Sequence, residues 1–357
     1  MTRGRSRLSG LGGYHSPQVP AEVRLNTNES PYPPPAAWQE DLAAAVAELE
    51  FHRYPDREAV ALRQGIASLH GVAPEEVFCA NGSNEVLQAI CLAYGGAGRS
   101  AAVFEPSYAL HPHIARLTGM TVIEGARDEE LLVDESELAR GLTAGGRFGT
   151  ADPAIEFLCS PNNPTGRAEP RDTVERVVAS APGLVVVDEA YGQFARWSAS
   201  ELLPDNPHLV VVRTFSKTWS LAGLRLGYAL GAPEVVEAME RVVLPYHLDA
   251  AKQLAGRLAL RHVDEMHERV ARISAERERV VHALRALGLR PFPSDANFVL
   301  FEVTGHDARE VWRSLVRQSV LVRDVSGFPR LARCLRVTIG TAAEDDAFLA
   351  ALGVALS

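Results

Sequence analysis

Apolar runs rich in Val, Ile and Phe alternate with helix-like segments between about residues 75 and 231. The runs read EEVFCA, SAAVFEP, MTVIEG, AIEFLCS, GLVVVDEA, HLVVVRTFSK and LRLGYAL. Short, continuously apolar runs of this kind are typical of strands that helices cover on both faces. The pattern therefore predicts an α/β fold with a mostly parallel sheet between helices.

A different pattern begins at residue 262. The stretch 262–288 has Val270, Ile273, Val280, Leu284 and Leu287 at helical spacing, which predicts a long amphipathic helix with these residues on one buried face. Beyond it, strands are expected in ANFVLFEV, SVLVRD and CLRVTIG, and helices around AREVWRSLVRQ and EDDAFLAALG. We expect the long helix to link two domains, the second a smaller α+β unit.

The length of 357 residues is more than one hydrophobic core usually serves, which also favours two domains with a ligand site between them. The Pro-rich stretch RLNTNESPYPPP predicts an extended arm. The expected organisation is an N-terminal arm over residues 1–35, a large ligand-binding domain over 36–260 and a small domain over 261–357.

Composition excludes several classes of protein. The net charge of -9 argues against a large nucleic-acid interface, and no apolar run approaches the roughly 20 residues of a membrane span. The basic start, MTRGRSRLSGLGG, is not followed by an apolar signal region. The four cysteines are far apart and are expected as buried thiols of a cytoplasmic protein: Cys79, Cys91, Cys159 and Cys334.

Two predicted strands end in residues of opposite charge. Lys217 closes VVVRTFSK and Asp188 closes LVVVD, and the carboxyl ends of parallel strands form the crevice where such sheets bind ligands. Most single lysines are solvated, and most acids at strand ends are caps or ion-pair partners. A buried carboxylate nevertheless needs a cation, and the protonated pyridine nitrogen of pyridoxal phosphate is one.

Other polar groups follow neighbouring strands. Asn163 lies in the turn sequence SPNNPTG, and both its amide and Tyr191 could reach the phenolate oxygen of such a cofactor. Tyr108 could stack on the pyridine ring. Each of these could instead be an ordinary turn or packing residue.

A phosphate needs hydrogen-bond donors, and three segments offer them. Ser83 and Asn84 begin the predicted helix of NGSNEVLQAICLAY, where backbone N–H groups favour anions. Ser216 and Arg225 flank the lysine with a hydroxyl and a guanidinium. For Ser83 or Asn84 alone, the role of a simple helix cap is the more common one.

Taken in order, these segments resemble the fold-type I aminotransferases over nearly the whole chain. The set RYPD, NGSNEV, FEPSY, SPNNPTG, VDEAY, TFSK with LAGLRLGY, LPYH, SDANFV and LVRD is most similar to the histidinol-phosphate aminotransferase family. The resemblance implies that pyridoxal 5'-phosphate is the cofactor, with Lys217 as its Schiff-base lysine and proton shuttle. It also implies that Asp188 pairs with the pyridine nitrogen, that Asn163 and Tyr191 hold the phenolate oxygen, and that Tyr108 stacks on the ring.

The resemblance assigns further roles. Ser83, Asn84, Ser216 and Arg225 would bind the cofactor phosphate, and Tyr54 of RYPD would reach the site of a neighbouring subunit. The implied assembly is a homodimer, in which the N-terminal arm joins the small domain and contributes to the dimer contact.

Two arginines are the main candidates for binding the substrate. By the same resemblance, Arg323 of LVRD and Arg336 of CLRVT would meet the substrate anion together with Asn163 and Tyr14 of the arm, since two guanidiniums suit a phosphate or a carboxylate. The sequence departs from the family pattern in VSGFPRLAR and around Tyr14. The expected reaction converts imidazole-acetol phosphate to histidinol phosphate with glutamate as donor.

Several alternatives stay open. The same scaffold could serve an aromatic amino acid aminotransferase, a phosphothreonine decarboxylase or a non-catalytic sensor. A dehydrogenase is disfavoured because Gly96, Gly98 and Ala101, a loose GxGxxA, follow a predicted helix and precede a strand, the reverse of the dinucleotide-binding order.

Two histidine pairs could suggest a metal site. They are His111 with His113 and His262 with His267, and neither has carboxylate or Cys ligands at a supporting spacing. We therefore expect no metal and place these four histidines on the surface.

Overall fold

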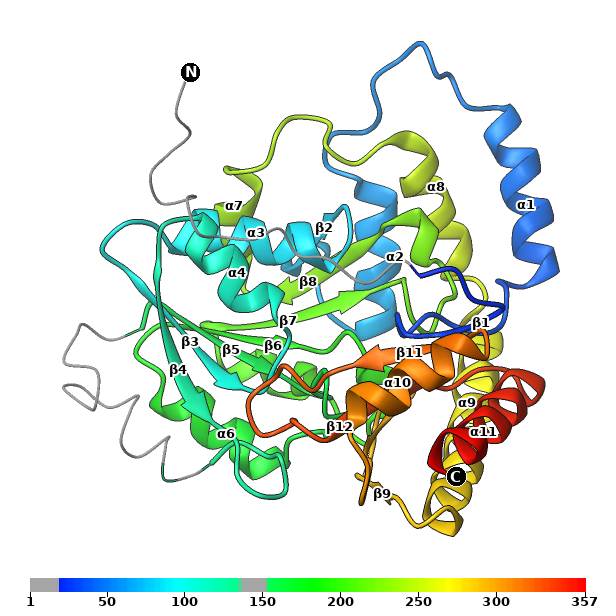
Figure 1. Ribbon diagram of the computed structural model, residues 1–357. Helices are drawn as coiled ribbons and strands as arrows, with labels where there is room; N and C mark the ends of the chain where they lie inside the picture. Colours follow the sequence, from blue (N-terminus) through cyan, green and yellow to red (C-terminus); the bar gives the residue numbers. More distant parts are fainter. Residues whose placement is uncertain (1–18, 135, 137–152) are drawn as a thin grey trace, which may run out of the picture.

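The computed structural model describes residues 19–134, 136 and 153–357. Its larger sheet confirms the prediction of a mostly parallel sheet (Figure 1), in the order β2-β8-β7-β6-β5-β3-β4. The strands are β2 (Val77–Ala80), β3 (Ser100–Glu105), β4 (Thr121–Ala126), β5 (Ile155–Cys159), β6 (Leu184–Asp188), β7 (Leu209–Thr214) and β8 (Gly227–Gly231). Only β8 runs antiparallel to its neighbours, β2 and β7; the other pairings are parallel.

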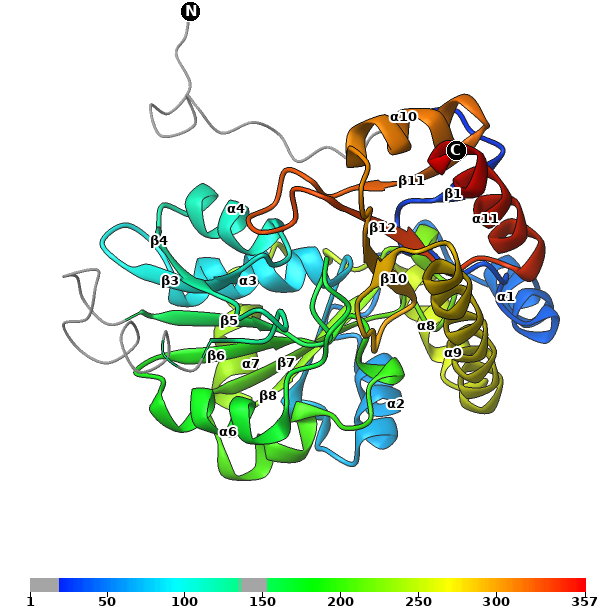
Figure 2. The same cartoon turned by 60° about the horizontal axis from the view of Figure 1, so that its bottom comes forward.

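Helices cover both faces of this sheet because successive strand residues point to opposite sides. Phe157 of β5 packs in the cluster beneath α3 (Ser83–Tyr94), α4 (Leu110–Leu117) and α7 (Pro233–Glu240). Leu158 packs on the other face with α2 (Val60–His70), α6 (Arg171–Ser180) and α8 (Ala250–Ala259), and α1 (Ala36–Ala47) lies against α8. Figure 2 shows α3 and α4 on one side of the sheet and α2 and α6 on the other. We call this assembly the large unit.

Short 3-10 helices connect several of these elements. They are η2 (Pro74–Glu76), η3 (Gly192–Phe194), η4 (Ala199–Asp205) and η5 (Ala222–Leu224). The last of these follows Lys217 and precedes β8, so the chain turns sharply where the lysine ends its strand.

The C-terminal part forms a second sheet with the order β1-β11-β12-β10-β9, which we call the small unit together with its helices. Its elements are β1 (Val23–Leu25), β9 (Arg290–Pro291), β10 (Phe298–Glu302), α10 (Ala308–Arg317), β11 (Val320–Asp324), β12 (Cys334–Thr338) and α11 (Ala342–Leu356). Strand β1 of the arm pairs in parallel with β11, so the start of the chain completes this distant sheet. The domain boundaries at residues 35 and 260 remain predictions.

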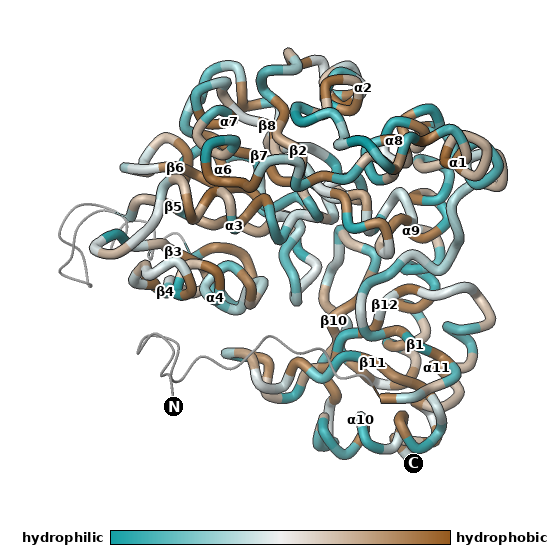
Figure 3. Tube along the Cα trace, turned by 90° about the horizontal axis from the view of Figure 1, so that it is seen from above, coloured by the Kyte–Doolittle hydropathy of each residue, from teal (hydrophilic) through white to brown (hydrophobic). Residues whose placement is uncertain are grey.

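The long helix is α9 (Val263–Ala286), close to the predicted span. Ile273, Val280 and Leu284 are buried as expected and Val270 is half-buried, but the prediction for Leu287 was wrong. Leu287 follows the last helical residue and is 38% exposed, because the chain leaves the helical path there. Hydrophobic stretches run through the strands of both sheets in Figure 3, so each unit has its own core.

Three smaller expectations can be compared with the fold. All four cysteines are free and buried, as predicted. Gly96 and Gly98 lie between α3 and β3, the helix-to-strand order that disfavours a dinucleotide site. Within the described residues, we find no helix with the length and apolar character of a membrane span.

Candidate active site

The carboxyl ends of the central strands open onto a cavity of about 360 Å³ whose lining comes from both units. The structure brings most of the predicted site residues together here. These are Ser83, Asn84, Tyr108, Asn163, Asp188, Tyr191, Ser216, Lys217, Arg225, Arg323 and Arg336.

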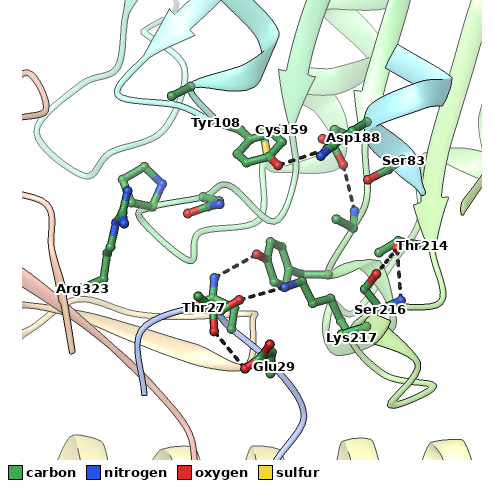
Figure 4. A pocket seen from close by; sticks show the side chains of 18 of the residues that line it. Thr27, Glu29, Ser83, Tyr108, Cys159, Asp188, Thr214, Ser216, Lys217 and Arg323 are labelled. Atoms are coloured by element: carbon green, nitrogen blue, oxygen red, sulfur yellow. Dashed lines mark hydrogen bonds between the residues drawn. The ribbon is translucent and has the colours of Figure 1, made fainter. Parts of the chain in front are cut away.

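Lys217 projects into this cavity just beyond β7 (Figure 4). Its Nζ donates to the backbone carbonyl of Thr27 at 3.1 Å and lies 5.7 Å from the centre of the Tyr191 ring. Burial lowers the pKa of Lys217 to about 7, and the positive charge of Arg336 acts in the same direction while Glu29 opposes it. In a large fraction of the molecules, the amine of Lys217 is therefore neutral at physiological pH.

Asp188 ends β6 and is 1% exposed. Its Oδ1 accepts a hydrogen bond from the backbone N–H of Ala190 at 3.1 Å, and its Oδ2 lies 2.9 Å from Nε2 of His111. A buried carboxylate that has only these partners among the described residues can pair with a further cation in the cavity.

The prediction of a surface position for His111 was wrong. The ring is fully buried on α4, stacked 4.9 Å from the ring of Phe157, because α4 lays this side of the helix against β5. Its polar edge meets Asp188, which explains how a polar residue is accommodated there. Its neighbour His113 is half-buried.

Tyr191 and Asn163 both line the cavity. The Tyr191 hydroxyl oxygen accepts a hydrogen bond from Nδ2 of Asn28 at 2.9 Å, and Arg336 donates to Oδ1 of Asn163. Burial raises the pKa of Tyr191, so its hydroxyl stays protonated and can donate. The Tyr108 hydroxyl donates to Oδ1 of Asn84 at 3.2 Å, which fixes the ring at the cavity wall.

One end of the cavity gathers donors suited to a phosphate. Helix α3 begins at Ser83, and its N-cap residue Gly82 supplies no side-chain cap for the first N–H groups. Gly82 has φ +81°, and a Cβ there would lie 2.7 Å from Nη2 of Arg225. Ser216 accepts from Nη1 of Arg225 at 3.2 Å and from Thr214 at 3.0 Å. Glycine therefore leaves room for the guanidinium beside the helix start.

The other end of the cavity carries the two arginines of the small unit. Arg323 of β11 and Arg336 of β12 are cross-strand partners. Arg336 is 6% exposed, donates to the backbone carbonyl of Asn26 at 2.8 Å and lies 5.0 Å from the centre of the Phe298 ring. Figure 4 places Arg323 on the opposite side of the cavity from Ser83 and Ser216. The cavity thus has two separate cationic ends.

One of the predicted residues that the structure describes does not line this cavity. Tyr54 is 81% exposed and stacks on Tyr246 of the same chain, with ring centres 4.6 Å apart. Tyr14 lies outside the described residues. Among the described residues no cluster of metal-ligating side chains exists; His262 pairs with Glu265 and is only half-buried, and His267 is exposed.

Several lining residues were missed by the sequence reasoning. The arm contributes Asn26, Thr27, Asn28 and Glu29, because β1 carries it across the small sheet to the lysine. The polar run LNTNES between Leu25 and the Pro-rich segment was the available signal. The cavity also receives Ser107, Cys159, Thr214, Val325 and Phe328.

Residues 20–352 match the family model for aminotransferases of class I and II. The chain belongs to this family. Similar curated relatives are histidinol-phosphate aminotransferases from Frankia casuarinae, 46% identical over 99% of this chain and 90% of theirs, and from Thermobifida fusca, 46% identical over 98% and 94%. The crystal structure of histidinol-phosphate aminotransferase from Sinorhizobium meliloti in complex with pyridoxal-5'-phosphate matches with a TM-score of 0.88 and 25% identity, covering 100% of this chain and 98% of that one.

The protein is thus a fold-type I aminotransferase, an enzyme family that uses pyridoxal 5'-phosphate. The side chains that line the cavity also suit this cofactor, independently of the comparisons. It combines a lysine with a pKa of about 7, a buried carboxylate, and a cluster of phosphate donors kept open by Gly82. These three features match the aldehyde, the ring nitrogen and the phosphate of the cofactor.

Proposed function

We propose that this aminotransferase interconverts histidinol phosphate and imidazole-acetol phosphate, with glutamate and 2-oxoglutarate as the second pair, in histidine biosynthesis. The observation that carries the proposal is the presence of two cationic ends in one cavity. One end suits the cofactor phosphate, and Arg323 with Arg336 at the other suits a substrate phosphate or carboxylate. The names of the relatives point to the same substrate.

Each cofactor group has a proposed partner in the chain. Ser83, Asn84, Ser216 and Arg225 would hold the phosphate. Asp188 would pair with the ring nitrogen and keep it protonated. When bound, the cofactor supplies an electron sink that stabilises negative charge on the substrate α-carbon.

Three further residues would fix the ring of the cofactor. Asn163 and Tyr191 would donate to its phenolate oxygen, and Tyr108 would lie against its face. These contacts orient the ring between Lys217 and Asp188.

Lys217 has two proposed tasks, and both need a neutral amine. Its Nζ would hold the cofactor covalently, and once free it would accept the proton of the substrate α-carbon and return it. Burial brings its pKa to about 7, which makes the neutral form available at neutral pH. The carbonyl of Thr27, 3.1 Å away, orients the amine without competing for its lone pair.

The substrate anion would meet Arg323, Arg336, Asn163 and, from the arm, Tyr14. An aromatic amino acid aminotransferase is the second candidate, because Phe328 and Tyr108 line the same cavity and suit an aromatic side chain. A guanidinium pair accepts either anion, so the charge alone does not separate the two substrates.

We further propose a cytoplasmic homodimer in which Tyr54 enters the neighbouring site. The four free, buried thiols suit a reducing compartment. Phe51, Tyr54 and Leu244 are each more than two-thirds exposed, and large apolar side chains of this kind suit a surface that a second copy would cover. The proposed domains are the arm 1–35, the large domain 36–260 and the small domain 261–357.

The test of the substrate is a pair of half-reactions. The holoenzyme is mixed with histidinol phosphate or with phenylalanine, each without a keto acid, and the change of cofactor absorbance is followed. We expect kcat/KM to be at least about 100-fold higher for histidinol phosphate, since guanidiniums placed for a phosphate, which extends further from the reacting carbon, would be left poorly paired by the shorter carboxylate of phenylalanine. Saturation by phenylalanine alone would replace this substrate assignment with the aromatic one.

A further inference from the structure

The loop of residues 325–331, between β11 and β12 of the small unit, forms part of the cavity wall. Val325 and Phe328 line the cavity, and the loop begins two residues after Arg323. Its backbone is compact: Phe328 donates to the carbonyl of Val325 at 3.0 Å, and Leu331 donates to the carbonyl of Phe328 at 3.2 Å. The position of the Phe328 ring therefore depends on where this whole loop lies.

The loop is docked on the large unit by an apolar contact. Val325 and Leu331 form a buried cluster with Leu131, and the half-buried Phe328 packs against it. Leu131 belongs to the chain between β4 and β5 of the large unit, so this cluster joins the two units beside the cavity.

A polar contact lies beside the apolar one. The guanidinium of Arg330 donates to the backbone carbonyl of Arg127, which follows β4. Arg330 has φ +65°, a left-handed conformation that is unfavourable for a residue with a Cβ. The docked loop thus carries a local backbone cost, which its contacts must offset.

The anchor on the large unit is rigid. Arg127 is fully buried and paired with the equally buried Glu169. Its side chain also donates to the carbonyls of Phe104 and Leu131, each at 3.1 Å. Arg330 therefore binds a carbonyl whose place is set by several other contacts.

We propose that Phe328 is a specificity-determining residue for the ring of the substrate, and that Arg330 is a positioning residue that holds Phe328 in the cavity wall through Arg127. The proposal rests on the proposed function, because it assigns the substrate a ring. Arg323 and Arg336 bind an anion, which the glutamate donor also carries, so they do not distinguish the two substrates. A flat aromatic wall gains contact area from an imidazole ring and much less from the chain of glutamate.

The test compares Phe328→Ala, Arg330→Ala and the double variant in the two half-reactions. The quantity measured is the ratio of kcat/KM for histidinol phosphate to kcat/KM for glutamate. We expect this ratio to fall about 10-fold in Phe328→Ala, the lower end of the range that loss of one apolar contact gives, and less, about 5-fold, in Arg330→Ala, which keeps the ring. The double variant should match Phe328→Ala, because two residues that act through one contact are not additive.

Three controls separate a local effect from general damage. Arg333→Ala removes an arginine of the same connection that pairs with Glu302 inside the small unit, and it should leave the ratio unchanged. Arg330→Lys can still donate to a carbonyl and should recover most of the wild-type ratio. Phe328→Leu keeps apolar volume, should fold normally, and should show a ratio between those of wild type and Phe328→Ala.

The outcomes are distinct. Equal losses for both substrates, or a double variant whose loss is the product of the single losses, would overturn the inference. If the wild-type enzyme itself fails with histidinol phosphate, the proposed function is what fails. The same ratio measured with phenylalanine then tests the aromatic wall by itself.

Discussion

Nε2 of His111 lies 2.9 Å from Oδ2 of Asp188, and both side chains are almost fully withdrawn from water. The histidine comes from α4 and the aspartate from the end of β6, so a helix on one face of the sheet orients a carboxylate at its edge. Phe157 stacks on the imidazole and fixes its plane. Asp188, the proposed partner of the cofactor nitrogen, is therefore held in position by His111.

The variant His111→Phe tests this relationship. It keeps an aromatic ring against Phe157 but removes the hydrogen bond to Asp188, and a bond to a charged group contributes about 1.5–3 kcal/mol. We expect the dissociation constant of the cofactor to rise about 10-fold or more, measured by absorbance titration of the apoenzyme. His113→Phe on the same helix is the matched control, and equal effects of the two changes would remove the special role of His111.

The pKa of Lys217 predicts the pH dependence of cofactor attachment. Only the neutral amine attacks the aldehyde, so the rate at which apoenzyme binds cofactor should rise with pH and level off above about 7. A lysine with the ordinary pKa of 10.5 would give a rate that keeps rising by about tenfold per pH unit well beyond pH 8. Stopped-flow absorbance between pH 5.5 and about 9.5 distinguishes the two profiles.

Glu29 provides a second test of the pKa of Lys217. Its negative charge raises the pKa of Lys217 against the effects of burial and Arg336. Glu29→Gln should therefore shift the midpoint of the rate profile to lower pH, while Glu22→Gln, an exposed position on the same arm, should not. A shift to higher pH in Glu29→Gln would contradict the assigned electrostatics.

Glu156 of β5 predicts a pH-dependent stability. Neither of its carboxylate oxygens has a hydrogen-bond partner in the described part of the chain, and burial raises its pKa to about 8 from 4.5. Between these two values the folded chain holds a proton that the unfolded chain releases, so stability is lost as pH rises from about 5 to 8. Over these three pH units the loss of unfolding free energy amounts to about 4 kcal/mol, at about 1.36 kcal/mol per pH unit.

Urea unfolding at several pH values measures this loss. Glu156→Gln cannot titrate and should flatten the fall in unfolding free energy between pH 5 and 8. Glu268→Gln, at an exposed position of α9, should keep the wild-type slope. An unchanged slope in Glu156→Gln would assign the pH dependence to other groups.

The proposed sharing of Tyr54 between subunits predicts complementation. Lys217→Ala and Tyr54→Ala homodimers should each be weak, but after subunit exchange the mixed dimers contain one site with both residues intact. About a quarter of all sites should then be active, as random pairing into two-fold dimers requires. If Tyr54 served only its own subunit, mixing would restore nothing.

The sequence was most informative where strands end. Lys217, Asp188 and Asn163 follow apolar runs, and parallel strands place such residues at one sheet edge by geometry alone. His111 was misplaced because its spacing on α4 does not reveal that the helix packs that side against Phe157. Thr27 and Glu29 were missed because their nearness to Lys217 depends on β1 joining β11, a pairing between segments almost 300 residues apart.

The loop of residues 325–331 was the part of the cavity wall that the sequence predicted least well. Phe328 and Arg330 lie in a loop with no regular pattern, and their role depends on a contact with Arg127, 203 positions earlier in the chain. Local propensity carries no information about such a contact, so only the folded arrangement reveals it.

The most direct measurement concerns Lys217 itself, and the chain makes it unusually clear because it contains only two lysines, Lys217 and Lys252. Lys252 is held by Asn81 and Asp249 outside the cavity. Holoenzyme reduced with borohydride and digested should carry the cofactor mass on the peptide with Lys217, and the Lys217→Ala variant should carry none and lose transamination. A label on Lys252, or full turnover after Lys217→Ala, would contradict the account.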